Sequence, residues 1–252
     1  MRKKVTGIYL LPNLLTTGSL FAAFYSIIAS FKGLYDTAAI AIFIGMIADG
    51  LDGRIARMTN TQTDFGAEYD SLSDMVTFGV APSVLLYSWA LNGMGKVGWL
   101  VAFVYTAAVA LRLARFNTQL ETADKRYFQG LACPGAGAVL SSFVWVSEST
   151  WSLHPWTPYV ASAISLFVSV LMVSNIRYYS FKDMDMKGKN RFLHVLLMIP
   201  VFVAIAADPS VTLFVAFFGY ALSGPLQTLI ALHRVRKFRR RIKRSVFNKE
   251  VK

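Results

Sequence analysis

Four aspartates in the first third of the chain lie at spacings that place them on helix faces. Asp49 and Asp52 are three residues apart and Asp70 and Asp74 are four apart, so each pair shares one face of a helix. Carboxylates crowded into a low-dielectric site repel one another and stay ionised only if cations bind between them. An all-oxygen ligand set favours Mg²⁺ or Mn²⁺. Two such ions, bridged by carboxylates, would suit in-line displacement at phosphorus.

Small residues and an arginine accompany the aspartates. Gly53, Ala56 and Gly66 leave space beside the carboxylates, so a bulky ligand could approach the backbone there. Arg57 follows Gly53 by about one helical turn and is well placed for a phosphate group. Acids that merely joined two helices would not need these neighbours, so the pattern favours a binding site over a structural role.

The elements that must position these residues are apolar helices. Hydrophobic residues make up 55% of the 252 residues, and they recur in runs long enough to cross a bilayer. The expected fold class is therefore all-α, a polytopic bundle of about eight transmembrane helices. The expected spans are residues 14–31, 36–57, 66–91, 97–117, 131–148, 156–176, 191–207 and 210–232. Joining or deleting two short segments would leave six spans.

Local signals refine this map. The short polar connection 58–65 makes the second and third spans antiparallel neighbours, so the two aspartate pairs can face each other. We expect Asp64 to be the N-cap of the third helix and Pro82 to kink it. Residues 5–13 mix apolar and polar side chains, which is typical of a short interfacial helix.

The basic residues predict the orientation in the membrane. With the N-terminus inside and eight spans, all but Lys32 and Lys96 of the 26 lysines and arginines lie in cytoplasmic segments. Both termini and the aspartates would then face the cytoplasm from the inner or plasma membrane. We divide the chain into a membrane domain, 1–232, and a basic cytoplasmic tail, 233–252. In a membrane protein, a net charge of +12 indicates anionic lipid as a partner, and not nucleic acid.

The aspartate segment resembles the signature of the CDP-alcohol phosphatidyltransferase family, D-x2-D-G-x2-A-R-x8-G-x3-D-x3-D. The matching residues, without a gap, are Asp49, Asp52, Gly53, Ala56, Arg57, Gly66, Asp70 and Asp74. The resemblance implies a helical membrane transferase of phospholipid biosynthesis, usually a homodimer.

The same resemblance implies roles for these residues. One divalent ion would be held by Asp49, Asp52 and Asp70. A second would be held by Asp49, Asp70 and Asp74, and Asp74 would also be the catalytic base. The residues lining the site for the CDP group would be Gly53, Ala56, Arg57 and Gly66.

Further segments are similar to one branch of the family, the membrane-integral phosphatidylserine synthases. They are residues 12–16, 77–83, 112–117, 128–134 and 180–182. The similarity implies CDP-diacylglycerol as the lipid substrate and L-serine as the acceptor. Because a carboxylate suits an arginine fork, Arg112 and Arg115 are candidates for binding serine, with Asn117 beside them. Asn13 is a candidate contact to the nucleotide.

Alternatives remain open on physical grounds. With glycerol 3-phosphate, inositol phosphate or choline as the acceptor, the chemistry would be the same. A phosphorylated acceptor would need additional cationic contacts, and choline would need an aromatic cage. A cation transporter would also carry aspartates within the membrane, but it predicts ion flux without lipid turnover. Cys133, the single cysteine, is expected to be a packing residue. The three histidines show no pattern that assigns them to a metal.

Overall fold

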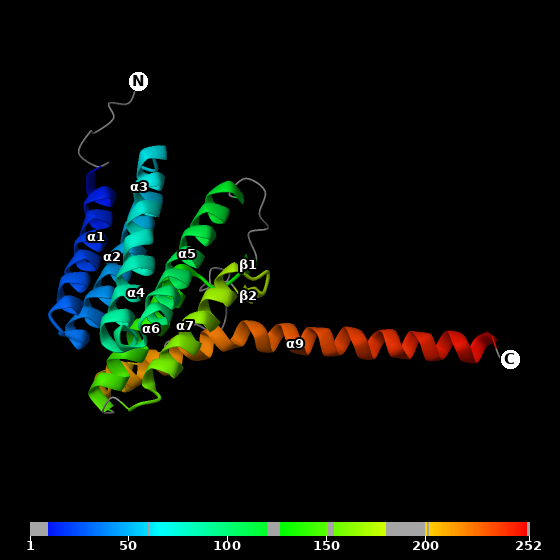
Figure 1. Cartoon of the computed structure of the whole chain (residues 1–252). Helices are drawn as coiled ribbons and strands as arrows, with labels where there is room; N and C mark the ends of the chain where they lie inside the picture. The colour runs from blue at the N-terminus through cyan, green and yellow to red at the C-terminus, as the bar shows by residue number, and fades with distance from the viewer. Residues whose placement is uncertain are drawn as a thin grey trace, which may run out of the picture.

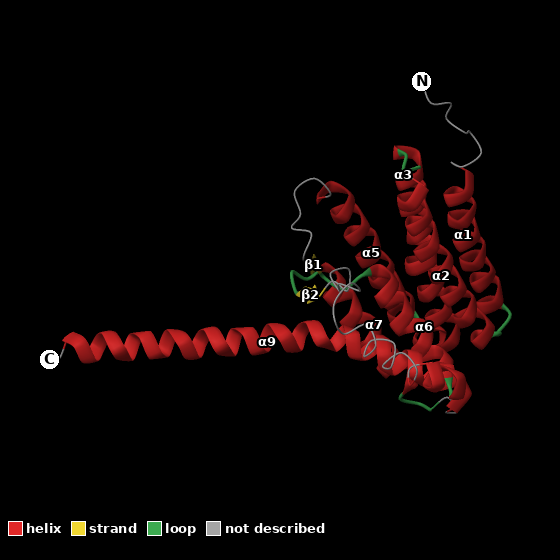
Figure 2. Cartoon of the chain, turned by 180° about the vertical axis from the view of Figure 1, so that it is seen from behind, coloured by secondary structure: helices red, strands yellow, loops and turns green. Residues whose placement is uncertain are grey.

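The computed structural model describes residues 10–59, 61–119, 127–150, 154–179, 200 and 202–250. These ranges are almost wholly helical (Figures 1 and 2). The α-helices are α1 (Leu10–Phe31), α2 (Tyr35–Thr59), α3 (Asp64–Asp74), α4 (Ala81–Leu86), α5 (Lys96–Gln119), α6 (Cys133–Thr150), α7 (Thr157–Val173) and α9 (Pro209–Glu250). Between α3 and α5 lie two π-helical segments, η1 (Met75–Val80) and η2 (Tyr87–Leu91), and the 3₁₀ turn η3 (Asn92–Met94).

The all-α prediction is confirmed. Each of the first six predicted spans coincides with a single continuous helical segment of its own. Among the residues that the structure describes, four helical segments are long and apolar enough to cross a membrane: Leu11–Phe31, Asp64–Met94, Lys96–Thr118 and Pro209–Thr228. The number of crossings and their direction stay predictions. The predicted span 191–207 lies mostly outside the described residues, as do residues 5–9. Helix α9 runs without interruption through the boundary expected at residue 232.

Two short strands, β1 (Tyr127–Gln129) and β2 (Arg177–Tyr179), form an antiparallel ribbon that the sequence did not predict. A strand of three residues is too short to show an alternating pattern, so periodicity gives no signal for it. Phe128 stands opposite Tyr178 in the register. The ribbon brings the segment before α6 against the segment after α7.

Helices α1 and α2 form an antiparallel hairpin. Gly33 stands at the turn with a φ of 74°, a left-handed conformation that glycine adopts without strain. Along the hairpin, Ala23 and Ala29 in α1 and Ala38 and Ala39 in α2 are buried. Small side chains let helix backbones approach closely in membrane proteins. The hairpin thus sets the start of α1 beside the aspartate end of α2.

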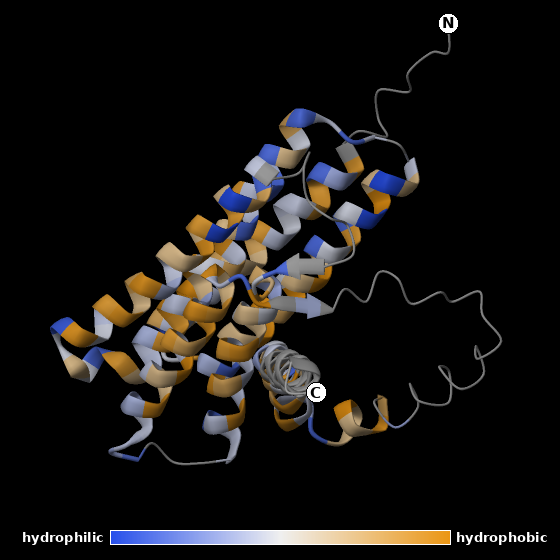
Figure 3. Ribbon diagram, turned by 90° about the vertical axis from the view of Figure 1, so that its right-hand side faces the viewer, coloured by the Kyte–Doolittle hydropathy of each residue, from blue (hydrophilic) through white to orange (hydrophobic). Residues whose placement is uncertain are grey.

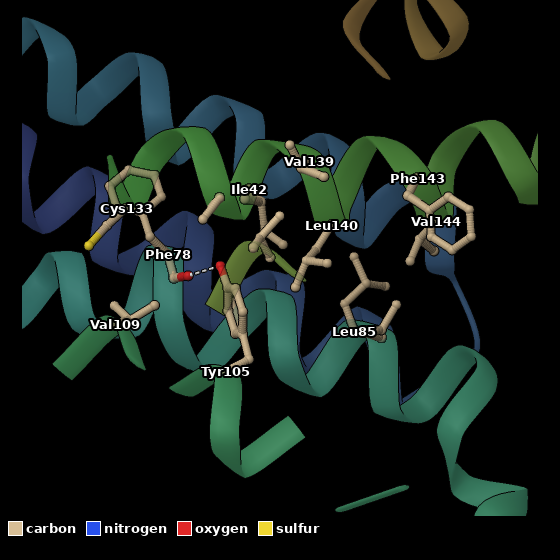
Figure 4. Close-up of a cluster of buried hydrophobic side chains, with 14 of the residues drawn as sticks. Ile42, Phe78, Leu85, Tyr105, Val109, Cys133, Val139, Leu140, Phe143 and Val144 are labelled. Carbon is tan, nitrogen blue, oxygen red and sulfur yellow. Dashed lines mark hydrogen bonds between the residues drawn. The ribbon is translucent and has the colours of Figure 1, made fainter. Parts of the chain in front are cut away.

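The helical rod from α3 to η3 passes through the core beside α5 and α6. Pro82 lies in α4 and has no N–H, so Phe78 O lacks the donor that an α-helix provides four residues later. The Tyr105 hydroxyl of α5 donates to Phe78 O instead, at 2.7 Å (Figure 4). Both side chains are fully buried. The residue expected to kink this helix is therefore accommodated by the π-helical segment η1 and a side-chain donor.

Apolar side chains fill the space between these helices. Ile42 of α2, Leu85 of α4 and Leu140 of α6 meet in one buried cluster (Figure 4). Gly137 of α6 lies against Phe78, because a Cβ there would stand 3.4 Å from the Phe78 backbone. Figure 3 shows hydrophobic residues along the middle of the bundle and hydrophilic ones gathered at the end where α3 begins. The aspartates lie toward that polar end.

The ribbon also holds α9. The buried Tyr178 hydroxyl of β2 donates to Ala221 O at 2.9 Å. Pro225 cannot donate to that carbonyl, so Tyr178 replaces the missing helix donor. Gly224 makes the approach possible, because a Cβ there would overlap the Tyr178 ring. Beyond this contact α9 leaves the bundle as a single long helix (Figures 1 and 2).

Candidate active site

The structure brings three of the four aspartates into one cluster between α2 and α3. One oxygen from each of Asp49, Asp70 and Asp74 lies within 4.8 Å of the others, and all three residues are partly buried. The carboxyls of Asp49 and Asp74 are within hydrogen-bonding range of each other. Oδ1 of Asp70 is buried and has no hydrogen-bond partner in the part of the chain that the structure describes. This donor set fits a hard divalent cation.

Asp52 lies beside this cluster and connects it to α1. Its carboxylate is buried, and Oδ2 accepts a hydrogen bond of 2.6 Å from Thr16 Oγ1. Its charge is close enough to act on both Asp49 and Asp70. Sequence reasoning missed Thr16. The sequence did contain a signal for this contact. Residues at nearly equal distances along the chain from the turn of an antiparallel hairpin lie side by side, and Thr16 and Asp52 lie at such distances from Gly33.

Further polar contacts fix α1 against α3. Ser73 Oγ donates to the Thr16 carbonyl at 3.2 Å. The hydroxyls of Thr17 and Tyr69 are hydrogen-bonded at 2.9 Å. The helix that carries Asp70 and Asp74 is therefore fixed to the same helix that orients Asp52.

The prediction that Asp64 caps α3 is wrong, since the cap is Thr63. Thr63 has an extended backbone, and its Oγ1 accepts a 3.0 Å hydrogen bond from the Gly66 N–H. Asp64 is already helical and adds negative charge to the first turn, where the helix dipole favours it. A Cβ at Gly66 would stand 3.4 Å from Asn13 Oδ1, so the predicted nucleotide contact Asn13 lies beside Gly66.

The other residues predicted to line the CDP site are in the last turns of α2. Gly53 directly follows Asp52, and a Cβ there would stand 3.9 Å from Arg57 Nη2. Ala56 is half-buried and Arg57 is exposed. The Arg57 guanidinium therefore lies near Gly53, which has no side chain to block the space next to Asp52, so a phosphate could reach it there.

The two arginines predicted to bind the acceptor have different surroundings. Arg115 donates through Nη1 to Val173 O at 3.4 Å. Through Nη2 it donates to Gln129 Oε1 and to Asn175 Oδ1, the latter at 2.6 Å. These acceptors belong to β1, the end of α7 and the segment that follows it. Arg115 therefore ties α5 to the base of the ribbon, a role that its sequence position did not reveal.

Arg112 has fewer hydrogen bonds than Arg115 to the residues that the structure describes. Its Nη1 donates to Cys133 Sγ at 3.4 Å, and its buried Nε finds no acceptor among the residues described. The Cys133 thiol is close enough to feel the charges of both Arg112 and Asp74. Cys133, expected to serve only in packing, thus also contacts an arginine of α5.

Asn117 does not join the arginines. Its Nδ2 donates to Ser71 Oγ at 3.1 Å, which links α5 to α3 next to Asp70. The contact holds two helices of the site, α5 and α3, together.

Fold and site together define a polytopic helical membrane protein with an acidic cluster that could hold a divalent cation. The family model described as CDP-alcohol phosphatidyltransferase matches residues 9–173. The chain belongs to this family, which confirms the resemblance seen in the aspartate segment.

Individual proteins support the same placement. The chain is 36% identical over 199 residues to CDP-diacylglycerol–serine O-phosphatidyltransferase of Helicobacter pylori, covering 79% of this chain and 84% of that one. It is 35% identical over 178 residues to archaetidylserine synthase of Methanothermobacter thermautotrophicus, covering 70% and 72%. Its fold is similar to the crystal structure of Mycobacterium tuberculosis phosphatidylinositol phosphate synthase with CDP-DAG bound. That match has a TM-score of 0.51 at 18% identity and covers 66% of this chain and 81% of that one.

Proposed function

We propose that this protein transfers the phosphatidyl group of CDP-diacylglycerol to L-serine, giving phosphatidylserine and CMP. The observation that carries the reaction class is the convergence of Asp49, Asp70 and Asp74, with a buried oxygen of Asp70 left unpartnered within the described ranges. Serine as acceptor is supported by the names of the Helicobacter and Methanothermobacter relatives, which both include it.

Asp49, Asp70 and Asp74 would hold one divalent ion, Mg²⁺ or Mn²⁺, and Asp52 would complete a second site beside them. Bound there, such ions supply positive charge that neutralises the diphosphate and stabilises the departing CMP. The Thr16 hydroxyl orients Asp52 for this task by fixing one carboxylate oxygen.

Asp74 is the base that we assign to the serine hydroxyl. It stands where α3 passes into η1, within the cluster that it forms with Asp49 and Asp70. Asp74 accepts the proton as the serine oxygen attacks the phosphorus that carries diacylglycerol. The new O–P bond forms as the bond from that phosphorus to the CMP oxygen breaks. The step is a single displacement without a covalent enzyme intermediate.

Arg112 is the residue that we assign to the serine carboxylate. Its Nε, which has no acceptor within the described ranges, and a neighbouring Nη form the side of a guanidinium that matches a carboxylate in a bidentate contact. Arg115 is already bonded to Gln129, Asn175 and Val173 and is assigned to the scaffold. Asn13, Gly53, Ala56, Arg57 and Gly66 are assigned to the CDP group.

We further propose that the site opens to the cytoplasm from the inner or plasma membrane, that the protein is a homodimer, and that the basic tail contacts anionic lipid. The distribution of lysine and arginine supports the orientation, and the family supports the dimer.

The test is CMP release by the purified protein in CDP-diacylglycerol vesicles. Serine, glycerol 3-phosphate, inositol 1-phosphate and choline are compared at equal Mg²⁺, with EDTA as the blank. We expect serine to be used at least about tenfold faster than the others, since a buried polar site rejects an acceptor that leaves it unpaired. A faster rate with another acceptor would show that serine is not the acceptor, while the assignment as a phosphatidyltransferase would still hold. Full turnover in EDTA would contradict the proposed metal site.

Arg112→Lys and Arg115→Lys separate the two arginines in the same assay. We expect Arg112→Lys to raise the KM for serine more than the KM for CDP-diacylglycerol, because lysine cannot form the bidentate contact. Arg115→Lys should instead lower the thermal midpoint, because it breaks the contacts with Gln129 and Asn175. The reverse pattern would exchange the two assignments.

A further inference from the structure

Three helical segments, α1, α2 and η1, meet at Gly45 of α2, close to the aspartate cluster. Gly45 is buried, and a Cβ placed on it would stand 3.0 Å from Thr77 Cγ2 of η1 and 3.3 Å from the Ser19 carbonyl oxygen of α1. Both distances are shorter than ordinary van der Waals contact, so there is no room for a side chain at this position. The three segments therefore approach one another here more closely than any residue other than glycine would allow.

Neither neighbour of Gly45 can move aside easily. Thr77 is fully buried, and its Oγ1 is hydrogen-bonded to Ser19 Oγ at 3.2 Å. Threonine is branched at Cβ, so turning Cγ2 away from Gly45 would also turn Oγ1 away from Ser19. The Ser19 carbonyl belongs to the backbone of α1 and cannot rotate by itself. A side chain added at Gly45 would therefore separate the helices.

The contact between Gly45 and Thr77 lies next to the aspartates along both chain segments. Gly45 is four residues before Asp49 and shares its face of α2. Thr77 is three residues after Asp74, and an oxygen of Asp74 lies within 4.8 Å of one of Asp49. Both residues of the α3–η1 segment therefore face α2, and the separation of the two segments at Gly45 bears on the separation of the two carboxyls.

We propose that Gly45 and Thr77 are positioning residues for the metal site. Their contact sets the distance between α2 and η1, and thereby the spacing of the Asp49 and Asp74 carboxyls. A small divalent ion binds its oxygen ligands within a narrow range of distances, so a slight separation of the helices weakens its binding. This inference rests on the proposed function, since it takes the aspartate cluster as a metal site.

The experiment measures Mn²⁺ binding to the purified protein in detergent without substrates, from the electron paramagnetic resonance signal of the free ion. We expect Gly45→Ala to weaken Mn²⁺ binding by roughly tenfold, because it shifts ligands that are themselves unchanged. Gly18→Ala in α1 is the matched control. Nothing lies within 4 Å of its Cβ position, so this variant should bind Mn²⁺ as wild type does.

A second substitution shows whether the spacing is responsible. Thr77→Ser removes Cγ2, the atom that the new Cβ would meet, and keeps the hydroxyl that bonds Ser19. Thr77→Ser alone should leave Mn²⁺ affinity within about twofold of wild type, and Gly45→Ala with Thr77→Ser should recover most of the lost affinity, because the two positions are in contact and their effects are not additive.

Wild-type affinity in Gly45→Ala would overturn the inference, as would a double variant that binds Mn²⁺ no better than Gly45→Ala. If Gly45→Ala does not fold, Ser19→Ala decides. It frees the Thr77 side chain to turn, so we expect Mn²⁺ binding to weaken by about threefold, as for one lost hydrogen bond. An unchanged affinity would overturn the inference. If wild type itself binds no Mn²⁺, the proposed metal site fails instead, so the two failures are distinguishable.

Discussion

At the scale of single residues, the site depends on side chains that orient the aspartates as well as on the aspartates themselves. Asp49, Asp70 and Asp74 converge, whereas Asp52 is held aside by Thr16. A residue that orients a metal ligand typically changes metal affinity by about 10–100-fold when it is removed. Thr16 is the clearest residue of this kind among those that the structure describes.

Thr16→Val removes the hydroxyl that donates to Asp52 while keeping a similar shape. We expect the Mg²⁺ concentration for half-maximal CMP release to rise by about tenfold, because Asp52 loses the contact that fixes its orientation. Thr16→Ser keeps the donor and should stay near wild type. An unchanged Mg²⁺ requirement in Thr16→Val would show that Asp52 is oriented by other contacts.

Spacing in the sequence was enough to predict the aspartate pairs, but not the partners of the arginines. Arg112 and Arg115 are three residues apart on one helix, and their types are identical. They differ in their contacts with Gln129, Cys133 and Asn175, which come from distant segments. Such contacts depend on how α6 and α7 pack, which no local pattern encodes.

At the scale of elements, two prolines within helices are each matched by a tyrosine from another element. Tyr105 donates to the carbonyl four residues before Pro82, and Tyr178 to the carbonyl four residues before Pro225. A buried carbonyl without a donor costs about 1–3 kcal/mol. The apolar runs predicted the helices themselves. The π-helical segments and the ribbon were not predicted, because they depend on these contacts between elements.

Gly224→Ala tests how β2 holds α9. The added Cβ would overlap the Tyr178 ring, so we expect a loss of about 1–3 kcal/mol, as for overpacking a well-packed core. Gly219→Ala is the matched control on the same helix, since nothing lies within 4 Å of its Cβ position. There the better helix propensity of alanine should stabilise by up to about 1 kcal/mol.

The measurement for this pair is the thermal midpoint in detergent micelles at one heating rate, because membrane proteins often unfold irreversibly. Equal midpoints for the two variants would mean that the Tyr178 contact does not hold α9.

At the scale of the whole molecule, the unequal distribution of basic residues predicts the orientation of the bundle. Lys32 in the turn between α1 and α2 is expected outside, and Gln62 between α2 and α3 inside. Both side chains are exposed, so a cysteine at either position would be open to a water-soluble reagent on its own side.

Lys32→Cys and Gln62→Cys in a Cys133→Ser background test this orientation. In intact cells we expect a membrane-impermeant maleimide to label the cysteine at position 32 and to leave the one at 62 unlabelled until the cells are permeabilised. Labelling of position 62 from outside would show that the bundle has the opposite orientation and that the aspartate cluster does not face the cytoplasm.

The contact between Tyr178 and Ala221 has a consequence at the far end of the chain. From Ala221 the helix continues to Glu250, an arm of roughly 43 Å at 1.5 Å per residue. On an arm of that length, a rotation of about 10° at its pivot carries the tip through about 7 Å, more than one helical pitch. A small change at this phenol–carbonyl hydrogen bond would therefore become a large displacement at the basic end of the chain, far from the bond itself.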